Sequence, residues 1–301
     1  MAKDIQGTEK HSPRYHNIDT WPAEDMLESL WASQLRAISC IQQSIPEISA
    51  SAEAIAERLS HGGRLFYIGA GSSGHLAIQD CVEINPTYGW PLDKLIPLIA
   101  GGKDALLAPM GGAEDDERIS VKSLKAHAIS AQDVIIAVAA SGSTPYTLAA
   151  VKHARSQGSL VISVANNRHA PIYDHAHHSI FLDSGSEVIA GSTRMAAGTA
   201  QKAALNMLST LTMTKLGHVH DGLMVSMVIN NEKLENRGAA IIQEITGSDS
   251  ETAKKCLNEA DKNIKLAVLL AMNHPKAEAE KALADNQGHL RQAMEKLKVT
   301  Y

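Results

Sequence analysis

Leu65-Phe66-Tyr67-Ile68-Gly69-Ala70-Gly71-Ser72-Ser73-Gly74 is the stretch that decides the fold of this chain. A short apolar run leads into a loop of glycines and hydroxyl side chains, and a helical pattern follows from His75. Glycines let backbone N–H groups approach a ligand closely, and a helix start adds unpaired donors with partial positive charge. The loop therefore suits a phosphate or another anion. The same letters also spell the G-x-G-x-x-G pattern of dinucleotide-binding folds, and alone they do not separate the two.

Strands and helices alternate after this stretch. The strands read as continuous apolar runs, which is typical of parallel strands covered on both faces. They are expected at Arg64–Ile68, Leu95–Ala100, Val134–Ala139, Leu160–Val164 and His178–Leu182. The helices between them are expected at Ser73–Val82, where Pro86 ends the helix, at Glu114–Ala126 and from Pro145 to Gln157. The fold class is therefore α/β, a doubly wound parallel sheet with ligands at the carboxyl ends of its strands.

Helical segments flank the sheet on both sides. Residues 1–23 read as an extended polar arm, and Pro46 is expected to break the helical pattern that follows the arm. Two helices are expected after the sheet, and from Ser248 a weak 26-residue repeat predicts small helical units. The expected helices are Ala23–Ser44, Ile48–Leu59, Thr193–Gly217 and Ile229–Ile242. We divide the chain into residues 1–60 (arm and packing helices), 61–247 (the sheet domain) and 248–301 (a helical module).

Composition excludes several classes of protein. A net charge of -5 argues against a general nucleic-acid binder, which would carry a basic face. No apolar run reaches about 18 residues, so we expect no membrane span. The N-terminus lacks the apolar core of a signal peptide. Three cysteines without paired spacing indicate reduced thiols, and hence a cytoplasmic location.

A second loop of the same kind, Ala140-Ser141-Gly142-Ser143-Thr144-Pro145, follows the expected third strand. A dinucleotide fold would not explain it, and would place an acidic residue after the second strand, where this chain has Ala100-Gly101-Gly102-Lys103. Two such loops would instead converge on one phosphate through hydroxyl and N–H groups, with no metal and no cofactor. The alternative is that these hydroxyls only cap a helix, and we expect one of them to do so.

Several further motifs accompany the two loops. The full set is Thr8-Glu9-Lys10, Gly69–Gly74, Glu83 with Pro86-Thr87-Tyr88, Gly112–Asp116, Ser141–Tyr146, Glu187–Met195, Ala197–Lys202, Asn206–Thr210, Asn231–Leu234 and the helical tail. Together these motifs resemble the N-acetylmuramic acid 6-phosphate etherase family, which is built on the sugar isomerase (SIS) fold. The resemblance spans nearly the whole chain. Several positions depart from the pattern: His75 stands where the family has Arg, and Ala196 where it has Lys. The residues around Glu83 and an acidic pair expected at Ala32-Ser33-Gln34 differ as well.

The resemblance implies a three-layer αβα sandwich with a C-terminal module similar to a ubiquitin-associated domain. It implies a carbon–oxygen lyase that splits the D-lactyl ether of N-acetylmuramic acid 6-phosphate into N-acetylglucosamine 6-phosphate and D-lactate, in cell-wall recycling. The partner is then a phosphorylated amino sugar, and the chain pairs as a homodimer with its site near the interface. The implied catalytic residues are Glu83 and Glu114. The implied phosphate-binding and substrate-binding residues are Gly71, Ser72, Ser73, Ser141, Gly142, Ser143, Thr144, Glu187 and Arg194.

The chemistry needs one carboxylate and one carboxylic acid in the same pocket, because a base must remove the C2 proton while an acid protonates the C3 ether oxygen. Glu83 is expected at the C-terminal end of a helix, where the helix dipole disfavours negative charge, and is assigned as the acid. Glu114 is expected to begin a helix, where N–H groups favour the ionised form, and is assigned as the base. The alternative is an acidic first turn at Glu114 and a surface carboxylate at Glu83.

Other candidates stay open. Glu187 contacts sugar hydroxyls or caps a neighbouring segment, and Arg194 meets an anionic group of the substrate or serves a subunit interface. His175-Ala176-His177-His178 is more typical of a solvated loop than of a metal site. Two other functions also remain: a non-catalytic sugar-phosphate sensor like the related glucokinase regulatory proteins, and a sugar-phosphate isomerase on the same fold. Neither of these would release lactate.

Overall fold

The computed structural model describes residues 7–108 and 110–298. Its backbone contacts divide the chain into two compact units. The first unit comprises Met1–Val82 and Asp93–Ser209, and the second comprises Glu83–Leu92 and Thr210–Tyr301. The division passes through two helices, so each unit is described separately below.

A five-stranded parallel sheet forms the centre of the first unit. Its strands are β1 (Leu65–Gly69), β2 (Leu95–Ile99), β3 (Val134–Val138), β4 (Leu160–Ala165) and β5 (His178–Phe181). They lie in the order β2-β1-β3-β4-β5 and every neighbouring pair is parallel. The expected α/β sheet and all five expected strands are therefore confirmed. The chain proceeds outward in opposite directions from β1 and β3, so the topological switch point lies between these two strands.

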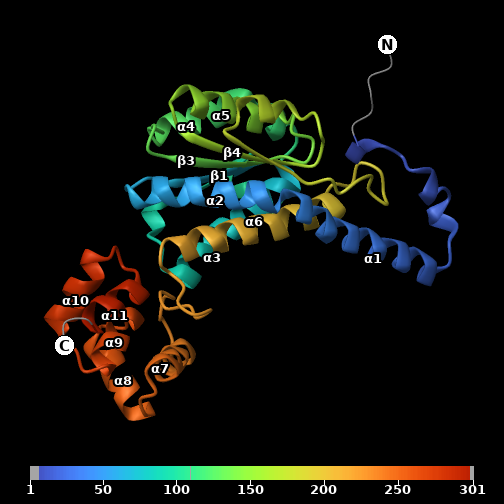
Figure 1. The fold of residues 1–301 in the computed structure, drawn as a ribbon. Coiled ribbons are helices and arrows are strands. Elements are labelled where there is room, and N and C mark those ends of the chain that lie inside the picture. The colour runs from blue at the N-terminus through green and yellow to red at the C-terminus, as the bar shows by residue number, and fades with distance from the viewer. Residues whose placement is uncertain (1–6, 109, 299–301) are drawn as a thin grey trace. The chain divides into compact units, whose positions relative to one another are not determined.

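Helices cover both faces of the sheet (Figure 1). One face carries α4 (Glu117–Ala126) and α5 (Pro145–Ser156), and the other carries α2 (Ile45–Ser60), the start of α3 (Gly71–Tyr88) and most of α6 (Ala196–Lys215). The core under α4 and α5 is apolar and fully enclosed, with Phe66, Ile135, Tyr146 and Val161 at 0–1% exposure. Burial of apolar surface on both faces thus holds the sheet in three layers.

Two prolines behave differently from the sequence-based expectation. Pro46 does not break a helix, because α2 begins at Ile45 and the proline sits in its first turn, where its missing N–H would be unpaired anyway. The preceding α1 (Ala23–Ser39) leads into α2 through the short 3-10 helix Cys40–Ser44. Pro86 does not end α3 either: it lies within the last turn of a helix that continues to Tyr88.

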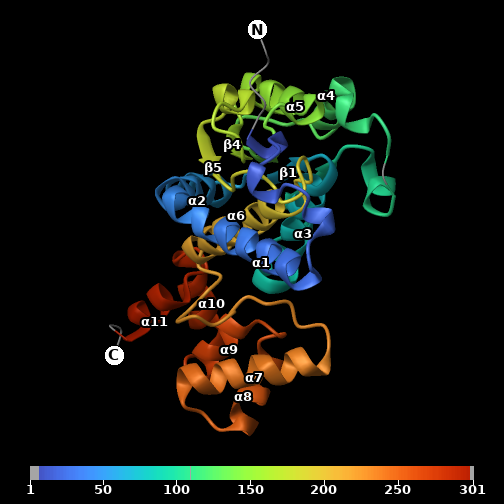
Figure 2. The same cartoon turned by 90° about the vertical axis from the view of Figure 1, so that its right-hand side faces the viewer.

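The second unit contains the end of α3 and a set of further helices. Its helices are the end of α6, α7 (Glu232–Thr246), α8 (Ser250–Glu259), α9 (Ile264–Ala271), α10 (Lys276–Asp285) and α11 (Leu290–Lys298). Gly247 adopts a left-handed conformation with φ of 71° and closes α7 as expected. The four last helices form two successive pairs, and Figure 2 shows α7, α8 and α9 stacked on one another.

The expected 26-residue repeat corresponds to these helix pairs. Ile264 and Leu290 each begin the second helix of a pair, and both are buried. They join one apolar cluster that includes Leu257 of α8 and Ile241 and Ile242 of α7. The tail therefore shares its core with α7. No helix in the described ranges has the length and hydrophobicity that a membrane crossing needs.

Candidate functional site

The two glycine-hydroxyl loops lie side by side at the switch point of the sheet. Gly69 ends β1 and pairs in register with Val138, which ends β3. The loop that begins at Ala70 and the loop that begins at Ala139 therefore start from neighbouring strand ends. This is the position at which doubly wound sheets bind their ligands. The structure thus brings the predicted phosphate-binding residues 71–73 and 141–144 to one edge.

The first loop is tight because two glycines leave no room for side chains. A Cβ atom built on Gly69 would lie 2.9 Å from the backbone of Gly74, and one built on Gly74 would lie 2.8 Å from the side chain of Ile99. The chain turns directly from β1 into α3, whose first residue is Gly71. The first N–H groups of this 18-residue helix have no intrahelical acceptor, so they are available to an anion at this edge.

The hydroxyl groups of the second loop do not cap the helix that follows it, α5. Thr144 occupies the N-cap position of α5, but its side chain makes no capping hydrogen bond. The hydroxyl groups of Ser141 and Thr144 instead lie 3.4 Å apart, and the N–H of Ser143 donates to Ser141 Oγ at 3.2 Å. The expectation that one hydroxyl caps the helix was wrong. Among the residues that the structure describes, the Ser141 and Thr144 hydroxyl groups contact each other and the N–H of Ser143, and no other part of the fold, which favours a ligand-binding role.

Gly142 fits the loop closely against its neighbour. It has a φ of +67°, and a Cβ atom here would lie 2.2 Å from that of Ala170. Its N–H donates to the carbonyl of Ala139, and its own carbonyl accepts the N–H of Ile172. Only glycine satisfies both the conformation and the spacing.

The side-chain amide of Asn167 contacts the backbone of this loop. The sequence did not indicate this residue as part of the site. Asn167 follows β4, and its Nδ2 lies 3.4 Å from the carbonyl oxygens of Ala140 and Ser141. Its side chain also exchanges two hydrogen bonds with Thr8: the Thr8 N–H donates to Oδ1, and Nδ2 donates to Thr8 Oγ1, each at 3.3 Å. Thr8 is 1% exposed. The pair of asparagines at the carboxyl end of a strand, Asn166-Asn167, is the signal that marks this position.

The N-terminal arm also meets the segment after β5. The Gly191 N–H donates to the Thr8 carbonyl at 3.2 Å, and a Cβ atom on Gly191 would lie 2.9 Å from a carboxylate oxygen of Glu9. Both views show the arm beside this segment, blue against yellow (Figures 1 and 2). Thr8 and Glu9 therefore link Asn167, which bonds to the loop after β3, to the segment Glu187–Met195.

Glu187 is a helix cap in this structure. It is 1% exposed, and its two carboxylate oxygens accept the N–H groups of Ala196 and Ala197 at 2.9 Å each. Burial raises the pKa of Glu187, while these two N–H groups act in the opposite direction. Of the two alternatives left open by the sequence, the geometry favours capping. A direct contact between Glu187 and the substrate stays a prediction.

Arg194 is exposed in the turn before α6, so its guanidinium is accessible to an anion. Two of the departures from the family pattern also lie at helix starts. Ala196 is fully buried under the Glu187 carboxylate. His75 is exposed on α3, and its Nδ1 lies 2.7 Å from the Gly71 carbonyl.

Glu83 and Glu114 are both exposed, and their surroundings differ from the expectation. Glu83 lies in α3 five residues before its last residue, Tyr88, so the proposed effect of the helix end on this carboxyl loses its basis. Glu114 lies in the 3-10 turn Ala113–Asp115 rather than in α4. Asp116 caps α4 and accepts the N–H groups of Arg118 and Ile119. Glu83 belongs to the second unit and Glu114 to the first.

The histidines near β5 have structural partners. His177 Nδ1 accepts the N–H of Val161 at 3.0 Å, and His178 Nδ1 lies 2.9 Å from the Glu47 carboxylate. Burial lowers the pKa of His177. Within residues 7–108 and 110–298, no three His, Cys, Asp or Glu side chains are arranged to hold a metal ion.

Comparison with known proteins identifies the family. N-acetylmuramic acid 6-phosphate etherase of Deinococcus radiodurans is 41% identical over 292 residues, which is 97% of this chain and 96% of that protein. N-acetylmuramic acid 6-phosphate etherase 1 of Vibrio cholerae is 41% identical over 288 residues, covering 95% and 96% of the two chains. This chain belongs to the N-acetylmuramic acid 6-phosphate etherase family. The expected family is therefore confirmed.

Domain matches and a solved structure agree with the fold of this etherase-family chain. Residues 118–211 match the SIS domain, and residues 47–155 match the glucokinase regulatory protein N-terminal SIS domain. A proposed phosphosugar isomerase from Bacteroides fragilis, described as involved in capsule formation, superposes with a TM-score of 0.51 at 17% identity. That superposition covers 67% of this chain and 95% of the isomerase chain, and it supports the SIS fold alone.

Proposed function

We propose that this protein cleaves the D-lactyl ether of N-acetylmuramic acid 6-phosphate, giving N-acetylglucosamine 6-phosphate and D-lactate, as a carbon–oxygen lyase of cell-wall recycling. The observation that carries the proposal is the juxtaposition of the loops after β1 and β3 at the switch point of the sheet. Relatives that carry the etherase name match nearly the whole chain. The phosphate is a handle here, and the reaction takes place on the sugar carbons.

The phosphate would bind to the N–H groups at the start of α3 and to the hydroxyl groups of the second loop. Gly71, Ser72 and Ser73 provide the first set, and Ser141, Ser143 and Thr144 the second, with Gly142 shaping the turn. Charge-assisted hydrogen bonds of this kind hold an anion without a metal. Arg194 is proposed to add a positive charge to this substrate.

The reaction would proceed by elimination and then addition of water. Opening of the sugar ring to the aldehyde makes the C2 proton acidic. A base removes this proton while an acid protonates the ether oxygen on C3, so the C3–O bond breaks and lactate leaves with that oxygen. Water then adds to C3 of the unsaturated aldehyde, and a proton returns to C2. The sum is one water consumed, with no oxidant or reductant.

Glu83 and Glu114 are proposed as the catalytic pair on their correspondence with the family's two glutamates. The assignment of Glu83 as the acid and Glu114 as the base is the hypothesis under test. Experiments in deuterated water distinguish the two roles. Glu114→Gln should abolish both exchange of the C2 proton and release of lactate, whereas Glu83→Gln should abolish lactate release and retain exchange. Glu117→Gln is the matched control, since it changes an exposed carboxylate three residues from Glu114. Near-normal lactate release by either variant would remove that residue from the mechanism.

We also propose that the enzyme is a homodimer. Leu27, Trp31, Leu35 and Ile38 of α1 are 49–64% exposed and recur at spacings of four and three residues, which gives one continuous apolar face. Such a face on a helix is a typical interface feature, and the family's site is expected near the subunit contact. The free thiols Cys40, Cys81 and Cys256 support a cytoplasmic location.

A sugar-phosphate sensor is the second candidate, because residues 47–155 match the glucokinase regulatory protein domain. A coupled assay for D-lactate distinguishes the two functions. Stoichiometric lactate from N-acetylmuramic acid 6-phosphate supports the etherase. Tight binding of the sugar phosphate with no lactate supports the sensor, and aldose–ketose interconversion without lactate supports an isomerase.

A further inference from the structure

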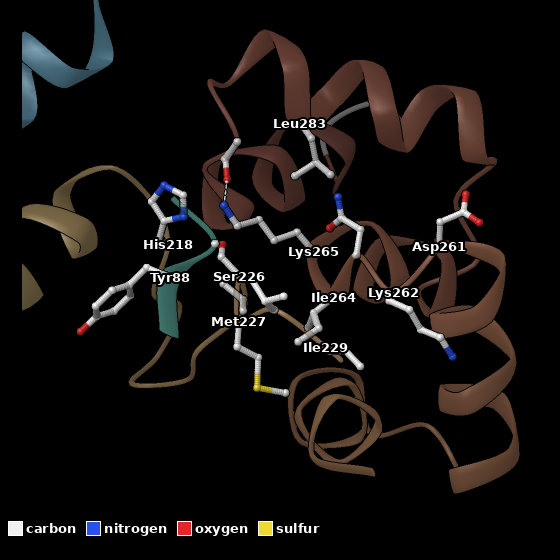
Figure 3. Close-up of a pocket in the computed structure, with 15 residues that line it drawn as sticks. Tyr88, His218, Ser226, Met227, Ile229, Asp261, Lys262, Ile264, Lys265 and Leu283 are labelled. Carbon is white, nitrogen blue, oxygen red and sulfur yellow. Dashed lines mark hydrogen bonds between the residues drawn. The ribbon is translucent and has the colours of Figure 1, made fainter. Parts of the chain in front are cut away.

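A cavity of about 480 Å³ lies entirely within the second unit (Figure 3). Its walls come from the end of α3, the connection Val225–Ile229, the start of α9 and the turn before α11. The volume falls in the range of small-molecule sites, about 300–1,000 Å³. None of its lining residues belongs to the two loops at the strand ends.

A buried lysine stands at the polar end of this cavity. Lys265 of α9 is 9% exposed, and its ammonium donates to the Gly288 carbonyl at 2.8 Å. Within the described part of the chain this is the hydrogen bond that its side chain makes, so two of its three N–H donors remain. Burial lowers the pKa of Lys265 to about 8, so most of the side chains are still charged near pH 7.

No nearby carboxylate neutralises this charge among the described residues. Asp261 also lines the cavity, but its side chain is 92% exposed and lies 3.6 Å from Lys276. Glu235 pairs with Lys262. Figure 3 shows Asp261 and Lys262 directed away from Lys265. A buried ammonium without a counter-ion is costly, and a bound anion would remove that cost.

Two further polar groups at the same end lack partners. Ser226 Oγ and His218 Nδ1 are buried and make no hydrogen bond in the described structure. Both residues line the cavity together with Lys265, and in the view of Figure 3 they lie at the same end as its ammonium. Rotation about χ1 can turn the serine hydroxyl toward a ligand oxygen. Burial lowers the pKa of His218 to about 4, so this ring is neutral at physiological pH. The polar end therefore offers one positive charge with neutral hydrogen-bonding groups.

Much of the remaining wall is apolar. Ile229, Ile264 and Leu283 line the cavity beyond the polar end, and Asp261, Lys262 and Asn263 form a polar part of its rim. A single positive charge matches a monoanion better than a phosphate dianion, and the apolar wall suits a short hydrocarbon body. We propose that this cavity binds a small monocarboxylate, with its carboxylate on Lys265 and Ser226. The assignment is independent of the reaction proposed above.

Trp90 reports on this cavity, because its ring lies 5.7 Å from that of His218. In the full-length chain with Trp21→Phe and Trp31→Phe, Trp90 is the remaining tryptophan. Acetate, butyrate and D-lactate would each be titrated at constant ionic strength, and inorganic phosphate separately. We expect a saturable change in fluorescence with the carboxylates and weaker binding of phosphate. Absence of saturation, or tighter binding of phosphate, would overturn the proposal.

Lys265→Met should raise the dissociation constant for butyrate about tenfold or more, because a charge-assisted hydrogen bond is lost. Lys262→Met is the matched control, since this lysine lies three residues away and is paired with Glu235. It should retain the original affinity. If Lys265→Met does not fold, Ser226→Ala decides the question. Its hydroxyl has no partner to lose, so the variant should fold and bind butyrate about threefold more weakly or worse. Unchanged affinity in Ser226→Ala would contradict the assignment.

Discussion

Asn167 and Thr8, which are 159 residues apart in the sequence, exchange two hydrogen bonds at 3.3 Å each. The same asparagine amide lies 3.4 Å from the carbonyls of Ala140 and Ser141. The N-terminal arm and the loop after β3 are thus both held by one side chain. Because Thr8 and Asn167 are both buried, the arrangement leaves the loop little freedom to move.

Thr8→Val tests this link. The variant keeps the shape of the side chain and removes the hydroxyl that accepts from Asn167. We expect unfolding free energy to fall by about 1 kcal/mol. KM for the phosphosugar should rise severalfold while kcat changes less, because the loop is proposed to hold the phosphate and to take no part in the chemistry. Thr20→Val is the control, since its hydroxyl is in the same arm but bonds locally to the Asn17 carbonyl. An equal change in KM for both variants would contradict the account.

Glu187→Gln tests the cap on α6. The amide nitrogen of glutamine is a donor, so it cannot accept from both Ala196 and Ala197, and one N–H is left unpaired in a buried place. We expect a loss of about 1–3 kcal/mol in chemical denaturation. Glu232→Gln, an exposed carboxylate in the first turn of α7, should change stability little. A neutral result for Glu187→Gln would show that the capping bonds contribute nothing.

The sequence was sufficient for the sheet but not for the details at helix ends. Continuous apolar runs located all five strands, because burial on both faces leaves a strong local pattern. Pro46 was misinterpreted because a proline in the first turn of a helix removes no hydrogen bond, and the sequence does not tell which turn it occupies. Pro86 was misinterpreted because α3 continues through it for two more residues although its missing N–H removes one hydrogen bond. Asn167 was missed because its role depends on three segments that only the fold brings together.

Ionisation of the Asp133 carboxyl makes the free energy of unfolding depend on pH. Its buried carboxylate accepts from Arg64 at 2.8 Å and from the Ser130 N–H at 2.8 Å, and these bonds outweigh burial and lower its pKa. The pKa of Asp133 is lower in the folded state than its value near 3.8 in the unfolded state. The carboxylate therefore stabilises the fold at pH values above 3.8, and this stabilisation is lost as the pH falls through the folded-state pKa. Asp133→Asn should therefore cost about 2–3 kcal/mol at pH 7. The difference in unfolding free energy between this variant and the original protein, measured by urea titration, should shrink below about pH 4. A difference that does not change with pH would show that ionisation of Asp133 does not stabilise the fold.

The exposed face of α1 predicts the oligomeric state. Trp31→Glu and Leu35→Glu place charge in the proposed interface, so sedimentation should show a shift from dimer to monomer, with the fold retained. Leu107→Glu is the control, because Leu107 is 95% exposed and lies outside this face. A dimer that survives both α1 substitutions would place the interface elsewhere.

The most direct test of the proposed reaction follows the oxygen of water. N-acetylmuramic acid 6-phosphate would be incubated with the protein in water enriched in oxygen-18 and deuterium, and both products analysed by mass spectrometry. Cleavage of the C3–O bond by elimination and hydration predicts oxygen-18 and deuterium in N-acetylglucosamine 6-phosphate, at C3 and C2, and D-lactate that retains the original ether oxygen. Oxygen-18 in the lactate hydroxyl, a product sugar without deuterium at C2, or no lactate at all would contradict the account.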